Sequence, residues 1–380
     1  MSTTTYRLAL IPGDGIGQEV APAAMRVLDA VAGRAGIVFE RTEYAWGCDY
    51  YRETGRMMPA DGLERLRDAD AIYLGAIGHP SVPDHISIWE LILPIRQRFE
   101  QYVNLRPMRL LPGVSGPLSG RGARDIDMVC VRENSEGEYA GLGGRLHRGT
   151  AHEVAEQTGL FTRMGIERVV RYAFQLARSR PRRLLASATK SNALQYSMVL
   201  WDEVVDDMAR TFPEVTVRRY HVDALAARMV TQPQTLDVIV ASNLFGDILT
   251  DLGAAVSGSL GIAPSGNINP ERRYPSMFEP IHGSAPVSAV RTAPVARLVT
   301  SIVTPGSTPP WVSVTRPVIC PVAWASAASG SSRTTARTAP AIRIQRSIGR
   351  PPSHALQETA PHYQTFVPGL HTRASSPRPR

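Results

Sequence analysis

The sequence predicts an α/β fold with a mainly parallel sheet, on the evidence of its apolar pattern and its length. Short apolar runs alternate with segments of helical periodicity up to about residue 286, which is typical of strands joined through helices. With 380 residues and 43% hydrophobic content, the chain can bury a large core and exceeds the ~100 to 200 residues of a usual domain. We therefore expect two α/β domains.

The same pattern places the individual elements. Strands are expected in YRLALI (6–11), IVFERTEY (37–44), AIYLGAI (71–77), IDMVCVREN (126–134) and TLDVIVASN (235–243). Helices are expected at about residues 18–32, 61–67, 165–179 and 198–211.

The composition changes after Pro286. Residues 287–380 carry 11 arginines against a single acid, Glu358, and 13 of the chain's 30 prolines. The net charge of +8 comes from this segment, because the first 286 residues carry 31 basic and 33 acidic groups. Helices and central strands tolerate few prolines. We expect an atypical basic tail at residues 287–380, and a reading-frame change near codon 287 would explain it.

Several classes of protein are excluded. No run approaches the ~18 consecutive apolar residues of a membrane span, and the N-terminus has no basic region followed by a long apolar one. The three cysteines, Cys48, Cys130 and Cys320, are far apart and encode neither a disulfide framework nor a thiolate zinc site. We expect a cytoplasmic protein without a membrane partner.

The first candidate site is the loop L-I-P-G-D-G-I-G at residues 10–17, which follows a predicted strand and precedes a predicted helix. Backbone N–H groups at such a helix N-terminus can hold an anion. The glycine spacing differs from the G-x-G-x-x-G dinucleotide fingerprint. The alternative is a tight turn that packs the helix on the sheet.

Three arginines lie at or near the ends of predicted elements. Arg106 precedes Pro107 and should be extended, and Arg132 follows the apolar strand residues 126–131, where α/β sheets place their ligands. Together with Arg96, they could hold the carboxylates of a diacid through paired hydrogen bonds. The alternative for each arginine taken alone is a solvated surface charge.

Carboxylates gather in NLFGDILTDLG, where Asp247 and Asp251 lie four residues apart on one face of an expected helix. Asp223 follows another apolar stretch and could add a third carboxylate. Adjacent carboxylates repel, and a hard divalent cation such as Mg²⁺ or Mn²⁺ relieves this because it prefers oxygen ligands. The alternative is a helix N-terminal charge for Asp247 and surface solvation for Asp251.

Lys190 is the single lysine among 42 basic residues. Arginine is effectively always protonated and so cannot act as a proton-transfer base. We interpret Lys190 as a residue required for proton transfer. The alternative is that a lysine occurs at this position by chance.

An ordered set of motifs gives the chain a family resemblance. The motifs are IPGDGIGQEV, NLRP, VRENSEGEYAG, KSNAL, VDALA, NLFGDILTD and EPIHGSAP. In this order and at these separations, over about residues 5–286, they closely resemble the metal-dependent β-decarboxylating dehydrogenases of the isopropylmalate and isocitrate dehydrogenase family. Within it, GHPSVPDHISIW and EQYVNLRP most resemble the tartrate dehydrogenase/decarboxylase and D-malate dehydrogenase branch.

The resemblance implies an isopropylmalate-dehydrogenase-like two-domain fold. The first, cofactor-side domain would comprise residues 1–102 and 255–286, and the second would comprise residues 103–254. The second domain would carry the substrate, metal and dimer contacts. The resemblance also implies a homodimer with shared active sites, in which Lys190 and Asp223 reach the site from the other subunit.

The resemblance further implies roles for individual residues. The expected substrate contacts are Trp89, Arg96, Arg106 and Arg132. The expected metal ligands are Asp223, Asp247 and Asp251, and the expected catalytic residues are Tyr139, Lys190 and Asp223. The expected cofactor contacts are Asn192, Glu279, His282, Gly283, Ser284, Ala285 and Pro286. NAD and Mn²⁺ or Mg²⁺ are the implied cofactors, with K⁺ as a further candidate.

Three residues bear on these expectations. Val287 stands where the family has the aspartate that selects NAD, so the adenosine half of the cofactor site would be missing. Pro94 lies two residues before Arg96 in an expected helix, at a cost of ~3 kcal/mol if it is interior. Trp89 lies seven residues before Arg96, about two helical turns, so it would share a face with Arg96 and fill the space that an isopropyl group needs. The alternative is that Trp89 only packs into the core.

The predicted function is the NAD- and metal-dependent oxidation of a small 2-hydroxy diacid such as tartrate or D-malate, with or without decarboxylation. One alternative is an inactive or unstable relative with a frame-shifted C-terminus, retaining at most diacid or metal binding. A second is a 3-isopropylmalate dehydrogenase. A third is a nucleic-acid-binding protein whose basic tail contacts phosphates. No recognition motif accompanies the charge of that tail, so nucleic acid is not an expected partner.

Overall fold

The described residues form a ten-stranded sheet and a separate two-stranded ribbon. The computed structural model describes residues 4–114 and 116–284. The strands of the large sheet are β1 (Thr4–Gly13), β2 (Ile37–Glu43), β3 (Ala71–Ala76), β4 (Val103–Arg109), β5 (Asp127–Glu133), β8 (Leu184–Thr189), β9 (Thr216–His221), β10 (Val238–Ala241), β11 (Pro264–Ile268) and β12 (Ser276–Pro280). The ribbon consists of β6 (Gly137–Leu146) and β7 (Val154–Leu160).

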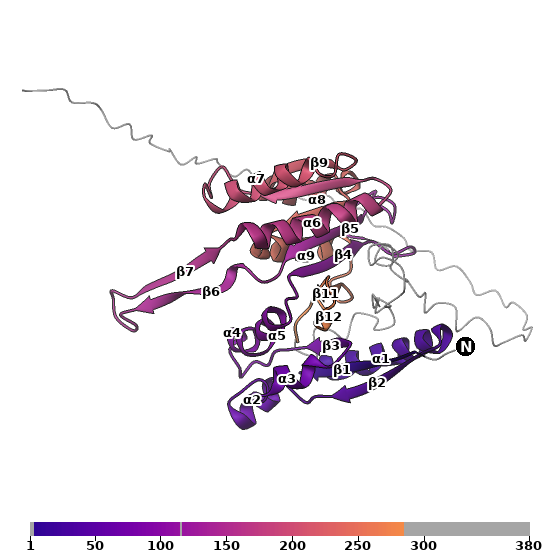
Figure 1. Cartoon of the computed structure of the whole chain (residues 1–380), viewed down its shortest axis with the longest axis vertical. Coiled ribbons are helices and arrows are strands. Elements are labelled where there is room, and N and C mark those ends of the chain that lie inside the picture. The colour runs from indigo at the N-terminus through magenta and orange to yellow at the C-terminus, as the bar shows by residue number, and fades with distance from the viewer. Residues whose placement is uncertain (1–3, 115, 285–380) are drawn as a thin grey trace, which may run out of the picture. The chain divides into compact units, whose positions relative to one another are not determined.

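Helices cover the large sheet (Figure 1). They are α1 (Gly17–Ala35), α2 (Cys48–Thr54), α3 (Gly62–Arg67), α4 (Asp84–Ser87), the π-helical turn η1 (Ile88–Ile92), α5 (Leu93–Arg98), α6 (Arg163–Ser179), α7 (Ser197–Ala209), α8 (Val222–Thr231), the 3-10 turn η2 (Pro233–Thr235) and α9 (Asn243–Val256). The predicted strands correspond to β1, β2, β3, β5 and β10, and the predicted helices correspond to α1, α3, α6 and α7.

The strand order of the large sheet is β2-β1-β3-β12-β11-β4-β5-β10-β8-β9. Neighbouring strands are parallel except at the three central junctions, β12 with β11, β11 with β4 and β4 with β5. The predicted α/β class with a mainly parallel sheet is therefore confirmed.

Alternation along the strands explains why helices lie on both faces of the sheet. In β5, Val129 and Val131 pack in the hydrophobic cluster that contains α6 and α7. The intervening Met128 and Cys130 pack in the cluster that contains α8 and α9. Successive side chains of a strand point to opposite faces, so a continuous apolar run buries both of them. This places α9 over the same face as Cys130.

The parallel strands bring the chemical residues to one edge of the sheet. Strands β5, β10, β8 and β9 run in the same direction, so their carboxyl ends lie side by side. Arg132 lies at the end of β5, α9 begins after β10, Lys190 follows β8 and Asp223 follows β9. Ligand sites of α/β sheets form at the carboxyl ends of the strands, so this is the expected place of the functional site.

The division into domains at residues 1–102 with 255–286, and 103–254, stays a prediction. The sheet is continuous through both parts, because β11 pairs with β4. The core is nevertheless divided into separate clusters, one around Ile11 and Leu74 and another around Val131 and Trp201. The tail predicted at residues 287–380 lies outside the described residues.

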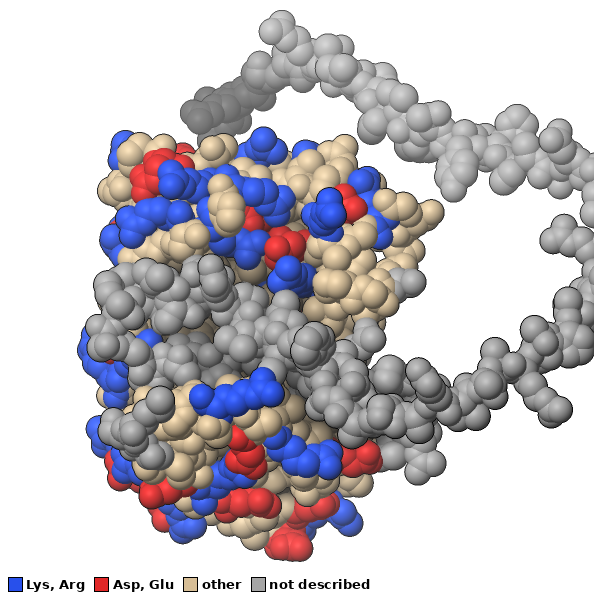
Figure 2. Space-filling model, turned by 90° about the vertical axis from the view of Figure 1, so that its right-hand side faces the viewer, with Lys and Arg blue, Asp and Glu red and all other residues tan. Residues whose placement is uncertain are grey.

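The surface charge of the described part is mixed. On the face shown in Figure 2, acidic side chains lie among the basic ones. Among the described residues, Arg163 pairs with Glu203 and Asp207, and Arg219 pairs with Asp202. This pattern agrees with the nearly balanced charge of the first 286 residues.

Candidate active site

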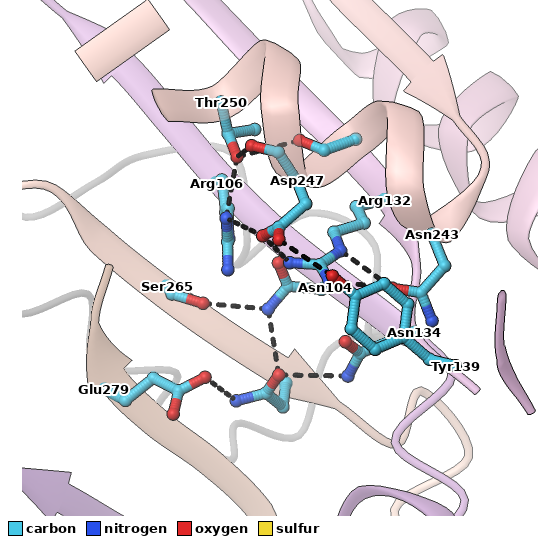
Figure 3. Close-up of polar contacts among 12 residues, drawn as sticks. Asn104, Arg106, Arg132, Asn134, Tyr139, Asn243, Asp247, Thr250, Ser265 and Glu279 are labelled. Atoms are coloured by element: carbon cyan, nitrogen blue, oxygen red, sulfur yellow. Dashed lines mark hydrogen bonds and ion pairs between the residues drawn. The ribbon is translucent and has the colours of Figure 1, made fainter. Parts of the chain in front are cut away.

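Arg106 and Arg132 lie side by side beneath α9 (Figure 3). Arg106 of β4 is opposite Cys130 of β5, so Arg132 is its diagonal neighbour on the same face of the sheet. The two arginines are only 5% and 2% exposed. A Cβ atom at Gly246 of α9 would come within 2.6 Å of Cγ of Arg132. The glycine therefore lets the helix lie directly against the arginine side chain.

Asp247 of α9 is the carboxylate between these two cations. Its Oδ1 accepts hydrogen bonds from Nη1 of Arg106, at 3.1 Å, and from Nη1 of Arg132. Burial acts to raise the pKa of Asp247, but the charges of Arg132 and Arg106 outweigh it and hold that pKa below its usual range. The site thus contains an ionised carboxylate fixed between two buried guanidiniums.

Tyr139 of β6 completes this group. Its hydroxyl donates a hydrogen bond to Oδ2 of Asp247 at 3.2 Å, and Cζ of Arg132 lies 5.5 Å from its ring centroid. Burial, and then the charge of Asp247, raise the pKa of the Tyr139 phenol. The phenol is therefore protonated at neutral pH and can donate a proton, which is the chemistry that the resemblance predicts for it.

Asp251 lies one turn along α9 from Asp247. Burial, and then the negative charge of Asp247, raise the pKa of its carboxyl group. The predicted i, i+4 placement of two carboxylates on one helix is confirmed. Their mutual repulsion is the electrostatic feature that a divalent cation would relieve.

Arg96 lies in α5 and forms a different ion pair. Its Nη2 donates to Oε1 of Glu279 at 2.7 Å, and Nδ2 of Asn267 donates to the same oxygen at 2.8 Å. Pro94 lies inside a helical stretch, as the sequence suggested, because residues 84–98 pass through α4, η1 and α5 without a break and the backbone of Ile92 has α-helical φ and ψ angles. Proline inside a helix lacks the N–H of the i→i−4 hydrogen bond and crowds the preceding turn, and the π-helical turn η1 lies directly before it.

The seven residues from Trp89 to Arg96 do not form the two regular α-helical turns that were expected. Trp89 lies in the π-helical turn η1, so the seven-residue interval is not two α-helical turns. Arg96 is buried, whereas Trp89 is 40% exposed, and the Trp89 ring lies against Gly141 of β6. The prediction that both residues share one face is therefore wrong in its geometry, and the role of Trp89 in the substrate pocket stays a prediction.

Lys190 and Asp223 form a pair of their own. Nζ of Lys190 donates to Oδ1 of Asp223 at 2.8 Å, and the two side chains are 29% and 68% exposed. This hydrogen bond lowers the pKa of Asp223. Among residues 4–114 and 116–284, no hydrogen bond or ion pair connects the pair with the group around Asp247 of the same chain. The resemblance assigns the pair to the site of the other subunit.

The expected cofactor contacts are dispersed. Asn192 is exposed in the turn after Lys190, and Glu279 is occupied by Arg96 and Asn267. The remaining described members, His282, Gly283 and Ser284, follow β12. Ala285 and Pro286 lie outside the described residues, as does Val287.

Ser284 approaches the glycine loop at residues 10–17. Its backbone N–H donates to the carbonyl of Ile77 at 3.3 Å, and a Cβ at Gly15 would come within 2.3 Å of its Oγ. Gly13 and Gly15 both have positive φ values, 76° and 49°, which favour glycine. The predicted strand, glycine turn and helix N-terminus are all present, and their use as an anion site stays a prediction.

Asp14, in the same loop, is a residue that the sequence analysis did not single out. It is 4% exposed and accepts hydrogen bonds from the backbone N–H groups of Cys48 and Gly78, with Oδ2 receiving both at 3.0 Å. Asp14 thus fastens the glycine loop to the start of α2 and to the loop after β3. Its position between two glycines was the only sequence signal.

Two polar residues of α9 were also missed. Asn243 accepts hydrogen bonds from Arg132, and Thr250 accepts one from Nη1 of Arg106 at 2.7 Å (Figure 3). They lie four residues before and three residues after Asp247, so all three share one helix face. Extending the helical spacing from Asp247 in both directions would have identified them.

Within the described residues, no cluster of three or more His, Cys, Asp or Glu side chains could hold a metal ion. In the same stretch of chain, no helix is long and apolar enough to cross a membrane.

The fold and the arginine–aspartate site define a class of protein that comparisons with known proteins identify. The isocitrate/isopropylmalate dehydrogenase family matches residues 7–304, and the chain therefore belongs to this family. It is 58% identical over 285 residues to the D-malate dehydrogenase (decarboxylating) of Escherichia coli (strain K12), covering 74% of this chain and 79% of that protein. It is 52% identical over 289 residues to the tartrate dehydrogenase/decarboxylase of Pseudomonas putida, covering 75% and 79%.

Solved structures agree with this assignment. The crystal structure of isocitrate dehydrogenase from Methylococcus capsulatus superposes with a TM-score of 0.67 and 31% identity, covering 82% of this chain and 83% of that chain. The family resemblance and the fold predicted from it are confirmed.

Proposed function

We propose that this chain is an NAD- and divalent-metal-dependent dehydrogenase that oxidises a small 2-hydroxy diacid such as tartrate or D-malate, with or without decarboxylation. The observation that carries the proposal is the group in which Asp247 contacts Arg106, Arg132 and Tyr139. The names of the relatives from Escherichia coli and Pseudomonas putida support the substrate class.

The arginines suit the carboxylates of such a substrate. Each guanidinium can hold a carboxylate through two parallel hydrogen bonds, and burial strengthens each of these interactions. Arg106 and Arg132 are fixed on neighbouring strands, and Arg96 would add a third cation from α5. Such an arrangement would recognise a small molecule that carries two carboxylates.

The described carboxylates fit a divalent cation. Asp247 and Asp251 offer hard oxygen ligands on one helix face, and burial, followed by the charge of Asp247, raises the pKa of Asp251. Asp223 would be the third ligand, supplied by the other subunit. A bound cation would polarise the substrate hydroxyl and stabilise the enolate formed on decarboxylation. Mn²⁺ and Mg²⁺ both suit these ligands, and K⁺ stays a further candidate.

The chain's own residues would hold and move protons. Lys190 is the proposed base at the hydroxyl, because an amine can give up its proton where a guanidinium cannot. Tyr139 is the proposed acid at the carbon that loses CO₂, because its phenol is protonated and directed at Asp247. Bound NAD would accept the hydride from the substrate.

The fit to NAD rests on the glycine loop at residues 10–17. Gly15 leaves no room for a Cβ beside Ser284, so the loop and the segment after β12 lie in contact, as a shared cofactor surface requires. The N-terminus of α1 would supply backbone N–H groups. Asn192, His282 and Gly283 complete the proposed contacts within the described residues.

A homodimer with shared sites is part of the proposal. The ribbon of β6 and β7 projects from the sheet (Figure 1) and exposes four large apolar side chains, Leu142, Leu146, Val154 and Leu160. An isolated two-stranded ribbon is marginally stable in water, and exposed apolar side chains that lie together are typical of an interaction surface. The exposed pair of Lys190 and Asp223 would then face the Asp247 group of the partner. A cytoplasmic location accompanies this proposal.

The test is NADH formation by the purified full-length chain with D-malate or tartrate, in the presence of Mn²⁺ or of EDTA. We expect absorbance to rise only with diacid, NAD and Mn²⁺ together, and CO₂ release to show whether decarboxylation accompanies oxidation. Turnover of neither acid, together with no binding of either acid in calorimetry, would contradict the proposal.

The composition of residues 287–380 favours a second candidate, an inactive relative that retains diacid and metal binding. The same experiment separates the two. Binding of D-malate with Mn²⁺ but without NADH formation would support the inactive relative, and restoring the family's C-terminus should then restore turnover.

A further inference from the structure

The first residue of α9 holds Arg132 by two of its nitrogens. Oδ1 of Asn243 accepts a hydrogen bond from Nε of Arg132 at 3.0 Å and another from Nη2 at 2.8 Å. Both residues are almost completely buried, with 1% and 2% exposure. A buried guanidinium that lost an acceptor would carry a large desolvation penalty, so this contact is a strong constraint on the orientation of Arg132.

The orientation of the Asn243 amide is itself determined by the fold. Its Nδ2 donates to the backbone carbonyl of Glu136 at 3.0 Å. The carboxylate of Glu136 in turn accepts hydrogen bonds from N and Oγ1 of Thr162, the N-cap of α6, at 2.9 and 2.6 Å. Reversing the amide would direct its N–H groups at a cation and its oxygen at a carbonyl. Only one orientation of Asn243 therefore satisfies its neighbours.

The contact leaves a defined part of the guanidinium for other partners. Arginine has five N–H donors, and Asn243 uses one on Nε and one on Nη2. The Nη1 group is directed at Asp247, and Gly246 allows the aliphatic part of Arg132 to lie against α9. The terminal nitrogens are thereby presented toward Asp247 and Tyr139, where the diacid is proposed to bind.

A neutral acceptor also preserves the positive charge of Arg132. An amide oxygen orients a guanidinium without compensating its charge, whereas a carboxylate at the same place would form an ion pair and compete with an anionic ligand. In the described site, Asp247 is already shared between Arg106 and Arg132. A second carboxylate at position 243 would leave little net positive charge to attract a diacid.

We propose that Asn243 is a positioning residue, which fixes the guanidinium of Arg132 in the orientation that binds a substrate carboxylate without adding a second negative charge to that of Asp247. This inference rests on the proposed function and adds a determinant of diacid affinity to it. Asn243 acts through Arg132 and touches no reacting atom.

The test compares Asn243→Ala and Asn243→Asp with the wild type in the full-length chain. The probe is D-malate in the presence of saturating Mn²⁺, measured by calorimetry, and Mn²⁺ binding alone is measured by electron paramagnetic resonance. We expect Asn243→Ala to weaken D-malate binding about tenfold or more, since two hydrogen bonds to a charged group are lost. Mn²⁺ affinity without D-malate should stay within about twofold, because Asp247 and Asp251 are retained. Where turnover is measurable, KM should rise more than kcat falls.

Asn243→Asp separates positioning from a purely structural role. It keeps the acceptor for Arg132 but adds a charge and replaces the donor to Glu136 by an oxygen, so we expect the variant to fold with a lowered unfolding temperature and to bind D-malate about tenfold or more weakly. The matched control is Asn269→Ala, which removes an equally buried asparagine outside the site, one that donates to Glu100 and accepts from Arg273. This control should lower the unfolding temperature without changing D-malate affinity.

The outcomes are distinguishable. Unchanged D-malate affinity in Asn243→Ala, with a lowered unfolding temperature like that of Asn269→Ala, would overturn the positioning role and leave the proposed function intact. Wild-type affinity in Asn243→Asp would overturn the requirement for a neutral acceptor. A wild type that binds neither D-malate nor tartrate in the presence of Mn²⁺ would overturn the proposed function and this inference with it.

Discussion

Arg96 of α5 and Glu279 of β12 form a buried ion pair between residues 183 positions apart, with 2.7 Å between Nη2 and Oε1. The pair joins an arginine expected at the substrate to a segment expected at the cofactor. Asn267 also donates to the same carboxylate oxygen. One carboxylate therefore connects α5, β11 and β12.

Replacing that carboxylate by an amide should destabilise the fold. In Glu279→Gln, Arg96 stays buried without its counter-charge, and we expect the free energy of unfolding to fall by about 3 kcal/mol. The measurement is urea denaturation followed by circular dichroism. The control is Asp61→Asn, which breaks the exposed pair with Arg65 and should cost less than about 1 kcal/mol. If the two substitutions lowered the free energy of unfolding equally, burial of the Arg96 ion pair would not increase its contribution to stability.

Helix periodicity and strand order account for what could be predicted from the sequence. The spacing of Asp247 and Asp251 predicted their common helix face, and the apolar strand before Arg132 predicted its place at a sheet edge. The ion pair of Arg96 with Glu279 could not be predicted, because it depends on antiparallel pairing of β11 with β4 and β12. The sequence spacing also predicted the wrong helix face for Trp89. It assumed a regular α-helix, whereas the π-helical turn η1 changes the angle between successive residues.

The two carboxylates of α9 should respond oppositely to neutralisation. Asp247 has a lowered pKa in the fold, so its charge stabilises the protein above pH ~4 and this contribution is lost as pH falls. Asp251 has a raised pKa, so its contribution is present below pH ~4 and is lost as pH rises. At pH 7 we expect Asp247→Asn to lower the free energy of unfolding and Asp251→Asn to leave it unchanged or raise it.

Mn²⁺ affinity should separate stability from ligation in these variants. Each substitution removes an anionic oxygen from the proposed hard-ion site, so we expect weaker Mn²⁺ binding in both. Electron paramagnetic resonance titration at pH 7 gives the affinity, and thermal unfolding gives the stability. An unchanged Mn²⁺ titration in both variants would remove Asp247 and Asp251 from the metal site.

Lys190→Arg should retain the fold and lose turnover. A guanidinium can keep the ion pair with Asp223, which Lys190 makes at 2.8 Å, but it cannot accept the substrate proton at neutral pH. We expect an unchanged unfolding temperature and NADH formation reduced at least about 100-fold. Arg218→Lys on the exposed side of β9 is the control and should be fully active. Near-normal turnover in Lys190→Arg would exclude Lys190 as the base.

Cys48 and Cys130 should resist alkylation in the folded protein. Burial raises the pKa of each thiol to about 12, so little thiolate exists at pH 8. We expect iodoacetamide to label both residues only after addition of urea, as read from modified peptides by mass spectrometry. The raised pKa values also predict a loss of stability between about pH 9 and pH 12, because the unfolded chain releases these protons first. Rapid labelling of Cys48 in the native protein would show that its surroundings open readily.

The exposed indole of Trp89 should control which diacid is accepted. Its ring lies against Gly141 of β6, where a Cβ would approach Cζ3 to 3.0 Å, and the same strand carries Tyr139. An indole beside the proposed acid would fill the space that the isopropyl group of 3-isopropylmalate requires, while D-malate and tartrate carry only hydrogen or hydroxyl there. We therefore expect kcat/KM to favour these two acids over 3-isopropylmalate by roughly 10-fold to 200-fold, the usual range for steric exclusion of a small alkyl group.

Trp89→Ala should reduce that preference by opening the space beside Gly141. We expect kcat/KM for 3-isopropylmalate to rise in the variant, while kcat/KM for D-malate falls or stays constant, because the larger pocket adds contacts only for the alkyl group. Tyr51→Ala, in α2 and outside the group around Asp247, serves as a control for loss of an aromatic side chain and should leave the ratio unchanged. If the wild type already turns over 3-isopropylmalate as well as D-malate, or if Trp89→Ala leaves their ratio unchanged, the indole does not line the substrate pocket.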